Sequence, residues 1–346
     1  MPRVIVCDVQ VPFVRGGAEI LVRELVRHLD AAGYPVDLVS LPFKWYPKPE
    51  ILAHAAAWRL LDLSESNGQP VDLVVATKFP SYFARHPNKV TWLVHQYRAA
   101  YELCGTRYGE FEHVETDVGL RDHLIRLDTR MLNESRRVFT IARNVSRRLR
   151  KYNGIEAEAL YPPPKLAGAL KAGPYGDYVL SVGRLESIKR VDLAIRALAR
   201  VPPPLRLVVV GHGSHHADLV RTAEEANVGD RVVFAGAVTD DELVELYAGA
   251  LAVVFVPYDE DYGYVTLEAF LARKPVITAA DSGGTLEFVE DGVNGLVLAP
   301  DPDALAGAFA DLAGRKARAA SLGEAGFARA RTVTWEGVIE KLVGQA

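Results

Sequence analysis

Short apolar runs alternate with amphipathic stretches along the first half of the chain. Strand-like runs occur at 3–9, 35–41, 71–77, 90–95 and 137–142. Helical patterns begin near Gly17 and cover 51–63 and 143–152. Near-continuous apolar strands that alternate with helices build parallel sheets covered on both faces. This half therefore predicts a doubly wound α/β domain.

The alternation stops at YPPPKLAGALKAGPYGD (161–177), where proline, glycine and alanine are typical of a linker. It then restarts with strand-like runs at 178–183, 205–211, 231–236, 251–256 and 274–279. The sequence therefore predicts two tandem Rossmann-like doubly wound domains, over 1–165 and 166–331, with a ligand cleft between them. Residues 332–346 predict a helix behind an N-cap threonine, Thr334, which we expect to return to the first domain.

Composition narrows the class of protein without changing this fold. The 346 residues are 49% apolar and 24% charged, typical of a soluble protein, and the net charge of −4 gives no argument for nucleic-acid binding. Cys7 and Cys104 form neither a disulfide framework nor a zinc-site spacing, which favours a reducing, cytoplasmic compartment. The start of the chain lacks a signal-peptide pattern, and no run of about 18 apolar residues predicts a membrane span.

Candidate binding residues lie where strands end, because ligands of open parallel sheets bind in the loops at the carboxyl ends of the strands. Gly16 and Gly17 follow the first strand and form either an anion-binding helix start or only a tight turn. His95 directly follows another buried strand, and its position fits either a catalytic or a structural histidine.

Two cations follow the first strand of the second domain. Arg184 lies at the strand end, and Lys189 lies where a helix is expected to begin. Cations at a helix start oppose the helix dipole unless an anion binds, which favours a diphosphate cradle over a solvated loop. The next loop contains Gly211 and three histidines whose spacing matches no metal-site pattern, so we predict no metal site.

The stretch PYDEDYGYVTLEAF (257–270) contains two glutamates eight positions apart. Gly263 precedes a predicted helix, whose first amide groups are suited to phosphate oxygens. Those amides belong to Tyr264, Val265 and Thr266. Glu268 lies in the first turns, where it can accept two sugar hydroxyls, and Glu260 lies in the loop, where it can accept hydroxyls of a second ring. In the preceding loop, a capping box at 239–242 leaves the backbone of Val238 available to a flat base.

Five elements occur in the order found in one known family. Glu260-x7-Glu268 with AFLARKPVITA resembles the signature of glycosyltransferase family 4, the retaining enzymes of the GT-B fold. GRLESIK resembles that family's arginine and lysine pair, RGGAE its glycine loop and DGVNGLVL its late turn. Each element is weak alone, but together they span nearly the whole chain and make a specific match.

The resemblance implies a nucleotide-sugar donor, a UDP- or GDP-sugar, bound mainly by the second domain without a divalent metal. It implies that Arg184 and Lys189 hold the diphosphate, that Glu268 binds the ribose and that Glu260 contacts the donor sugar. The remaining donor-side groups are Gly211, Val238, Tyr264, Val265 and Thr266. From the first domain, Gly16, Gly17 and His95 are expected at the reacting end.

Retention of the anomeric configuration is expected to proceed by front-face attack, with the leaving phosphate oxygen as the base. Glu260 then orients the sugar and is no nucleophile. The chain departs from the family pattern at Arg273, where glycine is common, and at Leu286-Glu287, where Pro-Glu is common. Together with the helix start at 264–265, which varies with the donor in the family, these departures leave the donor sugar open.

The acceptor is expected to be a hydroxyl of a glycan or of a lipid-linked acceptor. Segment 121–151 contains ten cations against three acids, a local net charge of +7 (10 − 3) in a chain of net charge −4. This basic segment either docks on an anionic surface at the inner face of the membrane or forms solvated helix faces. The aromatic and basic loop at 43–49 is either an acceptor contact or a surface turn.

Two other interpretations remain at this point, and two more are disfavoured. The same fold supports nucleotide-sugar epimerases and a catalytically inactive nucleotide-sugar binder. A phosphorylase needs a pyridoxal-bearing lysine and usually a longer chain. A dinucleotide-dependent dehydrogenase is disfavoured because G-x-G-x-x-G does not follow the first strand.

Overall fold

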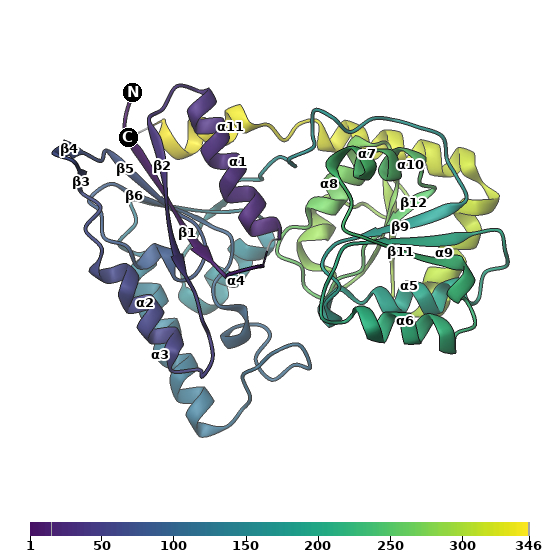
Figure 1. Cartoon of the computed structure of the whole chain (residues 1–346), viewed down its shortest axis with the longest axis horizontal. Helices are drawn as coiled ribbons and strands as arrows, with labels where there is room; N and C mark the ends of the chain where they lie inside the picture. The colour runs from purple at the N-terminus through teal and green to yellow at the C-terminus, as the bar shows by residue number, and fades with distance from the viewer. Residues whose placement is uncertain (15, 345–346) are drawn as a thin grey trace. The chain divides into compact units, whose positions relative to one another are not determined.

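Two six-stranded parallel sheets organise the chain in a computed structural model, which describes residues 1–14 and 16–344 (Figure 1). The chain divides into two compact units. Unit 1 contains Met1–Pro162 and Thr334–Ala346, and unit 2 contains Pro163–Val333. The α/β class with two parallel-sheet domains is confirmed. The observed unit boundary lies three residues before the predicted boundary at 165/166.

The sheet of unit 1 has the strand order β2-β1-β5-β6-β7-β8. Its strands are β1 (Val4–Gln10), β2 (Val36–Pro42), β5 (Leu73–Ala76), β6 (Lys89–Leu93), β7 (Arg137–Thr140) and β8 (Glu158–Ala159). A small antiparallel pair, β3 (Glu65–Ser66) and β4 (Gln69–Pro70), lies outside this sheet. The four residues of β5 are all buried, as a parallel strand covered on both faces requires.

Helices cover both faces of this sheet. They are α1 (Gly17–Ala31), α2 (Glu50–Leu60), α3 (Glu115–Leu132), α4 (Arg143–Asn153) and α11 (Trp335–Val343). Helices α1 and α11 lie on one side, and α2 and α3 lie on the other (Figure 1). Among the described residues, no helix combines the length and the apolar character that a membrane span requires.

The C-terminal helix α11 packs on unit 1 through aromatic rings. Trp335 stacks on His28 of α1 with ring centroids 4.7 Å apart, and it meets Trp92 of β6 edge-on at 6.1 Å. Thr334 is the N-cap residue, as predicted, but its side chain makes no capping hydrogen bond. Residues 345–346 of the predicted helix lie outside the described residues.

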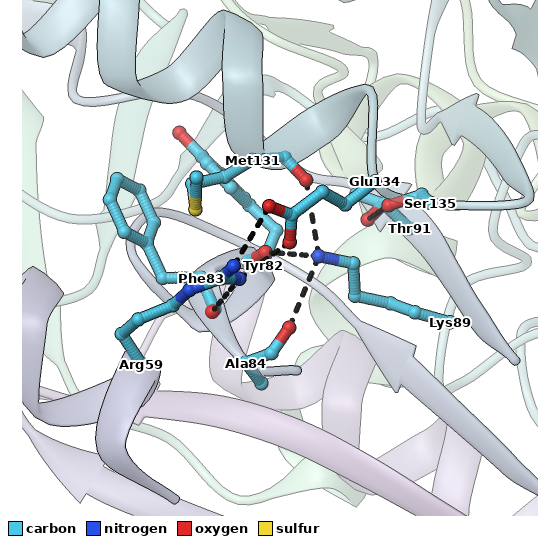
Figure 2. A network of polar contacts seen from close by, with 9 residues as sticks. All are labelled: Arg59, Tyr82, Phe83, Ala84, Lys89, Thr91, Met131, Glu134 and Ser135. Carbon is cyan, nitrogen blue, oxygen red and sulfur yellow. Dashed lines mark hydrogen bonds and ion pairs between the residues drawn. The ribbon is translucent and has the colours of Figure 1, made fainter. Parts of the chain in front are cut away.

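A buried lysine joins three segments of unit 1. Lys89, at the start of β6, is 1% exposed, and its ammonium group donates to the carbonyl oxygens of Tyr82 (2.7 Å), Ala84 (3.1 Å) and Met131 (3.1 Å). Figure 2 shows this arrangement beside the ion pair of Arg59 and Glu134. Burial lowers the pKa of Lys89 from 10.5 to about 8. The lysine satisfies carbonyls at the ends of two helical segments, so its role is structural.

The sheet of unit 2 has the strand order β11-β10-β9-β12-β13-β14. Its strands are β9 (Tyr178–Val182), β10 (Arg206–Val210), β11 (Val232–Gly236), β12 (Ala252–Val254), β13 (Val276–Ala279) and β14 (Gly295–Leu298). The chain runs outward from β9 to β11 and then returns to the other side of β9 at β12. The order therefore reverses between β9 and β12, and that switch point is where doubly wound sheets bind ligands.

Six helices flank this sheet. They are α5 (Val191–Leu198), α6 (His216–Glu225), α7 (Asp240–Gly249), α8 (Tyr264–Leu271), α9 (Pro302–Gly314) and α10 (Lys316–Ala330). Helices α5 and α6 lie on one face, and α7, α8 and α10 lie on the other (Figure 1). Leu198 and Phe309, from α5 and α9, are both fully buried in the core.

The predicted linker is anchored rather than free. From residue 163 onward it belongs to unit 2. The ammonium group of Lys274, which is fully buried, donates to the carbonyl oxygens of Gly173 (2.9 Å) and Pro174 (3.0 Å), 3.9 Å from the ring centre of Tyr175. The proline and glycine content therefore marks an irregular segment that a buried cation fixes to its own domain.

Two details of unit 2 differ from the sequence prediction. Helix α5 begins at Val191 instead of Lys189, because a 3₁₀ turn over Ser187–Lys189 precedes it. The late turn of DGVNGLVL is present at 292–294, and strand β14 begins directly after it at Gly295, which the sequence analysis did not predict.

Candidate active site

The switch point of unit 2 brings two predicted site residues into contact. Lys189 ends the 3₁₀ turn behind β9, and Glu260 lies in the loop behind β12. Their ammonium and carboxylate groups form a direct ion pair, with both side chains mostly buried. The ammonium group also lies 5.7 Å from the ring centre of Phe255. The two groups that the resemblance assigned to the diphosphate and to the sugar are therefore neighbours.

A pocket opens beside this pair at the carboxyl end of β9. Gly183, Arg184, Lys189 and Phe255 are among the residues that line it. Arg184 is exposed, unlike the partly buried Lys189. Two cations thus line the same small cavity, of about 10 Å³, and cations close together suit an anion at its surface.

The pocket floor depends on a close contact between two loops. Gly211, behind β10, has φ +124°, and a Cβ atom there would lie 2.0 Å from the carbonyl oxygen of Gly183. Any side chain at 211 would push the β9 and β10 loops apart. Gly211 therefore permits this close approach, and its own amide donates to the carbonyl oxygen of Gly236 at 2.8 Å.

Helix α8 begins directly after the loop of Glu260. Gly263, its N-cap residue, has φ +83°, and a Cβ atom there would lie 2.8 Å from the Phe255 ring. The amide of Thr266 donates to the carbonyl oxygen of Gly263 at 3.0 Å, so this N–H already has a partner. The predicted anion site at this helix start therefore rests on Tyr264 and Val265, which precede the first hydrogen-bonded turn.

Glu268 is held by a residue that sequence reasoning missed. Tyr247 of α7, which is fully buried, donates its hydroxyl to the Glu268 carboxylate at 2.7 Å. Burial raises the pKa of Glu268, and this hydrogen bond opposes the rise. The tyrosine therefore favours the ionised form that accepts sugar hydroxyls. A tyrosine at a buried position of a helix gives no sequence signal for such a role.

The loop behind β11 contains the predicted base-reading backbone. The predicted capping box of Thr239 and Glu242 is confirmed, with the Glu242 amide donating to the Thr239 hydroxyl at 3.3 Å. The amide of Ala237 donates to Nε2 of His212 at 2.9 Å, so Nε2 is the acceptor and Nδ1 carries the proton. Val238, the next residue, lines an open pocket with residues of α7.

In unit 1 the loop of Gly16 and Gly17 also contacts an ion pair. Gly16 is the N-cap residue of α1, which begins at Gly17. The Gly16 amide donates to the Glu19 carboxylate at 2.8 Å, and the other oxygen of Glu19 pairs with Lys78, which is buried behind β5. Asp8 of β1 lies 3.7 Å from the same ammonium group. The first amide of the loop is therefore already engaged by a carboxylate that the sequence analysis did not single out.

His95 follows β6, as predicted, and is partly buried. Its Nδ1 lies 2.8 Å from the carbonyl oxygen of Gln96. Because a carbonyl only accepts, Nδ1 carries the proton and Nε2 is the basic nitrogen of the neutral ring.

The basic segment at 121–151 is less uniform than its composition indicates. Arg148 is 5% exposed and pairs with Glu102, and Arg150 pairs with Glu156. Arg121 donates to the carbonyl oxygen of Ala100 at 2.9 Å. Several of the ten cations therefore have partners inside unit 1. The exposed cations of α3 and α4 include Arg126, Arg130, Arg147 and Lys151.

Side chains that could hold a metal ion are a different group from these cations. Within 1–14 and 16–344, no group of three or more histidine, cysteine, aspartate or glutamate side chains could hold a metal ion.

Known structures with a similar fold cover nearly the whole chain. Sucrose-phosphate synthase (tll1590) from Thermosynechococcus elongatus is 22% identical with a TM-score of 0.78, over 99% of this chain and 98% of that one. Anabaena Alr3699/HepE in complex with UDP and glucose is 19% identical with a TM-score of 0.72, over 99% and 98%. At these identities the likeness establishes the fold, which is GT-B.

Curated relatives match about half of the chain. The D-inositol 3-phosphate glycosyltransferase of Acidothermus cellulolyticus is 35% identical over 182 residues, 49% of this chain and 40% of that protein. The enzyme of the same name from Mycolicibacterium paratuberculosis is 34% identical over 199 residues, 55% of this chain and 45% of that protein. The matches thus span less than half the length of these relatives.

The family model described as "Glycosyl transferases group 1" matches residues 170–329. This range covers nearly all of unit 2 and contains Lys189, Glu260 and Glu268. Residues 170–329 therefore match the glycosyl transferases group 1 family, which confirms the resemblance inferred from the sequence for this part of the chain.

Proposed function

We propose that this protein is a metal-independent retaining glycosyltransferase that moves a hexosyl unit from a UDP- or GDP-sugar to a hydroxyl of a glycan or of a lipid-linked acceptor. The observation that supports it most directly is the pair of Lys189 and Glu260 at the β9/β12 switch point, beside Arg184 and the start of α8. Cations and a helix N-terminus suit a diphosphate, and a carboxylate next to them suits sugar hydroxyls.

The proposed division of roles follows the order of groups along the site. Lys189 and Arg184 neutralise the diphosphate, aided by the amides of Tyr264 and Val265. Glu268, held by Tyr247, accepts the ribose hydroxyls. Glu260 orients the hexose. Because the cations and the helix dipole supply positive charge at the leaving group, the proposal requires no divalent metal.

The proposed chemical step is front-face attack. The bond between C1 of the sugar and the leaving phosphate oxygen breaks while the acceptor oxygen bonds to C1 on the same face. The proton of the acceptor hydroxyl passes to that phosphate oxygen, so the products are the glycoside and the nucleoside diphosphate. No protein nucleophile takes part, and we propose that His95 and the loop of Gly16 and Gly17 serve the acceptor side.

The nucleotide-sugar itself is the first reagent to test. In a thermal-shift screen with EDTA present, we expect one UDP- or GDP-sugar to raise the unfolding temperature, since a ligand at about 100 times its dissociation constant adds about 2.7 kcal/mol. UDP-glucose is the first choice, because a structure with a similar fold holds it. No response to any UDP-, GDP- or ADP-sugar contradicts the proposal, and conversion of the donor without an acceptor product favours an epimerase.

Glu260→Gln separates orientation of the sugar from binding of the nucleotide. We expect transfer to fall by about a hundredfold, because the amide cannot accept sugar hydroxyls as a carboxylate does. The dissociation constant for the nucleoside diphosphate should change little. Glu290→Gln, at an exposed position of unit 2, is the matched control. Near wild-type turnover of Glu260→Gln would remove the assigned role.

Tyr247→Phe tests how Glu268 is kept ionised. Burial raises the pKa of Glu268 and the tyrosine hydroxyl lowers it, so removing the hydroxyl raises that pKa further. Nucleotide binding needs the carboxylate. As the solution is acidified, the affinity of the variant should therefore begin to fall at a higher pH than the affinity of the wild type. We expect at least about tenfold weaker binding near pH 6, from loss of a hydrogen bond to a charged group.

Calorimetric titration of the nucleotide from pH 5 to pH 8 measures this shift. Tyr178→Phe is the matched control, since its hydroxyl donates to the backbone oxygen of Leu246 at 2.7 Å instead of to a carboxylate. Superimposable pH profiles for Tyr247→Phe and the wild type would show that Tyr247 has no influence on Glu268.

The acceptor proposal includes contact with an anionic membrane through the exposed cations of α3 and α4. Each basic residue near such a surface contributes roughly 1 kcal/mol. We expect salt-sensitive flotation with anionic vesicles, weakened in the double variant Arg126→Gln/Arg130→Gln. The control variant Arg196→Gln/Arg221→Gln changes exposed cations of unit 2. Flotation that is absent, or that salt does not reduce, leaves these cations as solvated helix faces.

A further inference from the structure

Arg190 occupies an unusual position directly after Lys189. Its backbone has φ +53°, in the left-handed region that non-glycine residues rarely adopt, and its side chain is 5% exposed. Such a conformation is unfavourable and persists only where its surroundings enforce it. The contacts of the guanidinium group show what enforces it.

The guanidinium group of Arg190 binds the chain where β12 ends. Its Nε donates to the carbonyl oxygen of Val256 at 2.7 Å, and Nη2 donates to that of Pro257 at 2.9 Å. Its two terminal nitrogens also donate to the two carboxylate oxygens of Asp281, behind β13, at 2.8 and 2.6 Å. One side chain therefore connects the loops that follow β9, β12 and β13.

Asp281 extends this connection toward Glu260. Its backbone carbonyl oxygen accepts a hydrogen bond from the amide of Asp259 at 2.9 Å, and Asp259 itself has φ +41°. The residue before it, Tyr258, donates its amide to the carbonyl oxygen of Ile188 at 2.9 Å. The four residues before Glu260 are thus each tied to a neighbouring loop.

The backbone of Glu260 is held from the other side as well. The amide of Gly284 donates to the Glu260 carbonyl oxygen at 2.7 Å. A Cβ atom at Gly284 would lie 2.3 Å from the carbonyl oxygen of Asp261, so only glycine permits this contact. Gly284 follows Asp281 by three residues, and both therefore act on the same loop.

An arginine that satisfies backbone carbonyls can also serve stability alone, and the partly buried Arg231 of the same unit is the comparison. Its guanidinium group donates to the carbonyl oxygens of Val201 (2.8 Å) and Leu198 (2.9 Å). These carbonyls lie behind α5, on segments that contain no candidate site residue. Arg190 differs because its carbonyls belong to the loop that presents Glu260, and because Lys189 is its neighbour in the chain.

We infer that Arg190 and Asp281 form a positioning pair that fixes the loop at 256–260, so that Glu260 faces Lys189 and the donor sugar. The inference rests on the proposed function for its substrate. That the pair fixes the loop does not depend on the proposed function. Arg190 and Asp281 are positioning residues and touch no reacting atom.

Arg190→Lys tests the pair, because lysine keeps the charge but loses the forked geometry that spans a carboxylate and two carbonyls. In ligand-free protein, we expect amide hydrogen exchange at Tyr258 and Asp259 to accelerate by about tenfold or more. Arg231→Lys is the matched control and should leave exchange at these two amides unchanged. Asp281→Asn, which keeps the shape and removes the charge, should accelerate exchange in the same segment.

With UDP-glucose or whichever nucleotide-sugar binds best, turnover of Arg190→Lys should fall by about tenfold or more while the dissociation constant of the free nucleoside diphosphate changes less than about threefold. A loss of turnover without a loss of nucleotide affinity distinguishes misplacement of Glu260 from general destabilisation, which would lower both turnover and nucleotide affinity.

Unchanged exchange at Tyr258 and Asp259 in both Arg190→Lys and Asp281→Asn overturns the inference. Faster exchange with full turnover also overturns it, because the pair would then serve stability alone. A wild-type protein that responds to no nucleotide-sugar overturns the proposed function instead, and the exchange result still decides whether the pair fixes the loop.

Discussion

The ion pair between Lys189 and Glu260 is the contact on which the rest of the donor site depends. A cation and a carboxylate that are mostly buried together need each other, because either charge alone would be costly to remove from water. The pair can form only where the loops behind β9 and β12 meet, and the strand order of unit 2 places those loops side by side. Fold topology therefore decides which charges become neighbours.

Close approach of these loops is possible because glycines replace side chains at the contacts. Gly211 lies against the carbonyl of Gly183, and Gly284 lies against that of Asp261. Neither contact leaves room for a side chain, since a single added Cβ atom would lie 2.0 or 2.3 Å from a carbonyl oxygen. Glycines at strand ends thus serve loop packing, and amide groups at the start of α8 remain as the candidates for phosphate binding.

Local features of the site were predictable from sequence, and long-range ones were not. The capping box at Thr239 is set by residues three positions apart, so its pattern is visible in the sequence. The hydrogen bonds of Arg190 to Val256 and Asp281 span 66 and 91 residues, and the bond from Tyr247 to Glu268 spans 21. The order of strands in the sheet determines which residues become partners over such distances. The apolar runs in the sequence predict the class of fold but do not predict this order.

The two acids of the candidate site have different partners, and the difference fits different roles. Glu268 faces a neutral tyrosine hydroxyl, which holds one oxygen and adds no charge that a ligand must displace. Glu260 faces Lys189, whose charge a diphosphate would share. Under the proposed function, a diphosphate would attract the ammonium group of Lys189 and weaken its ion pair with Glu260, which would leave the carboxylate to accept sugar hydroxyls. Under the proposed function, the backbone contacts at 256–260 hold the loop in a way that does not depend on Lys189.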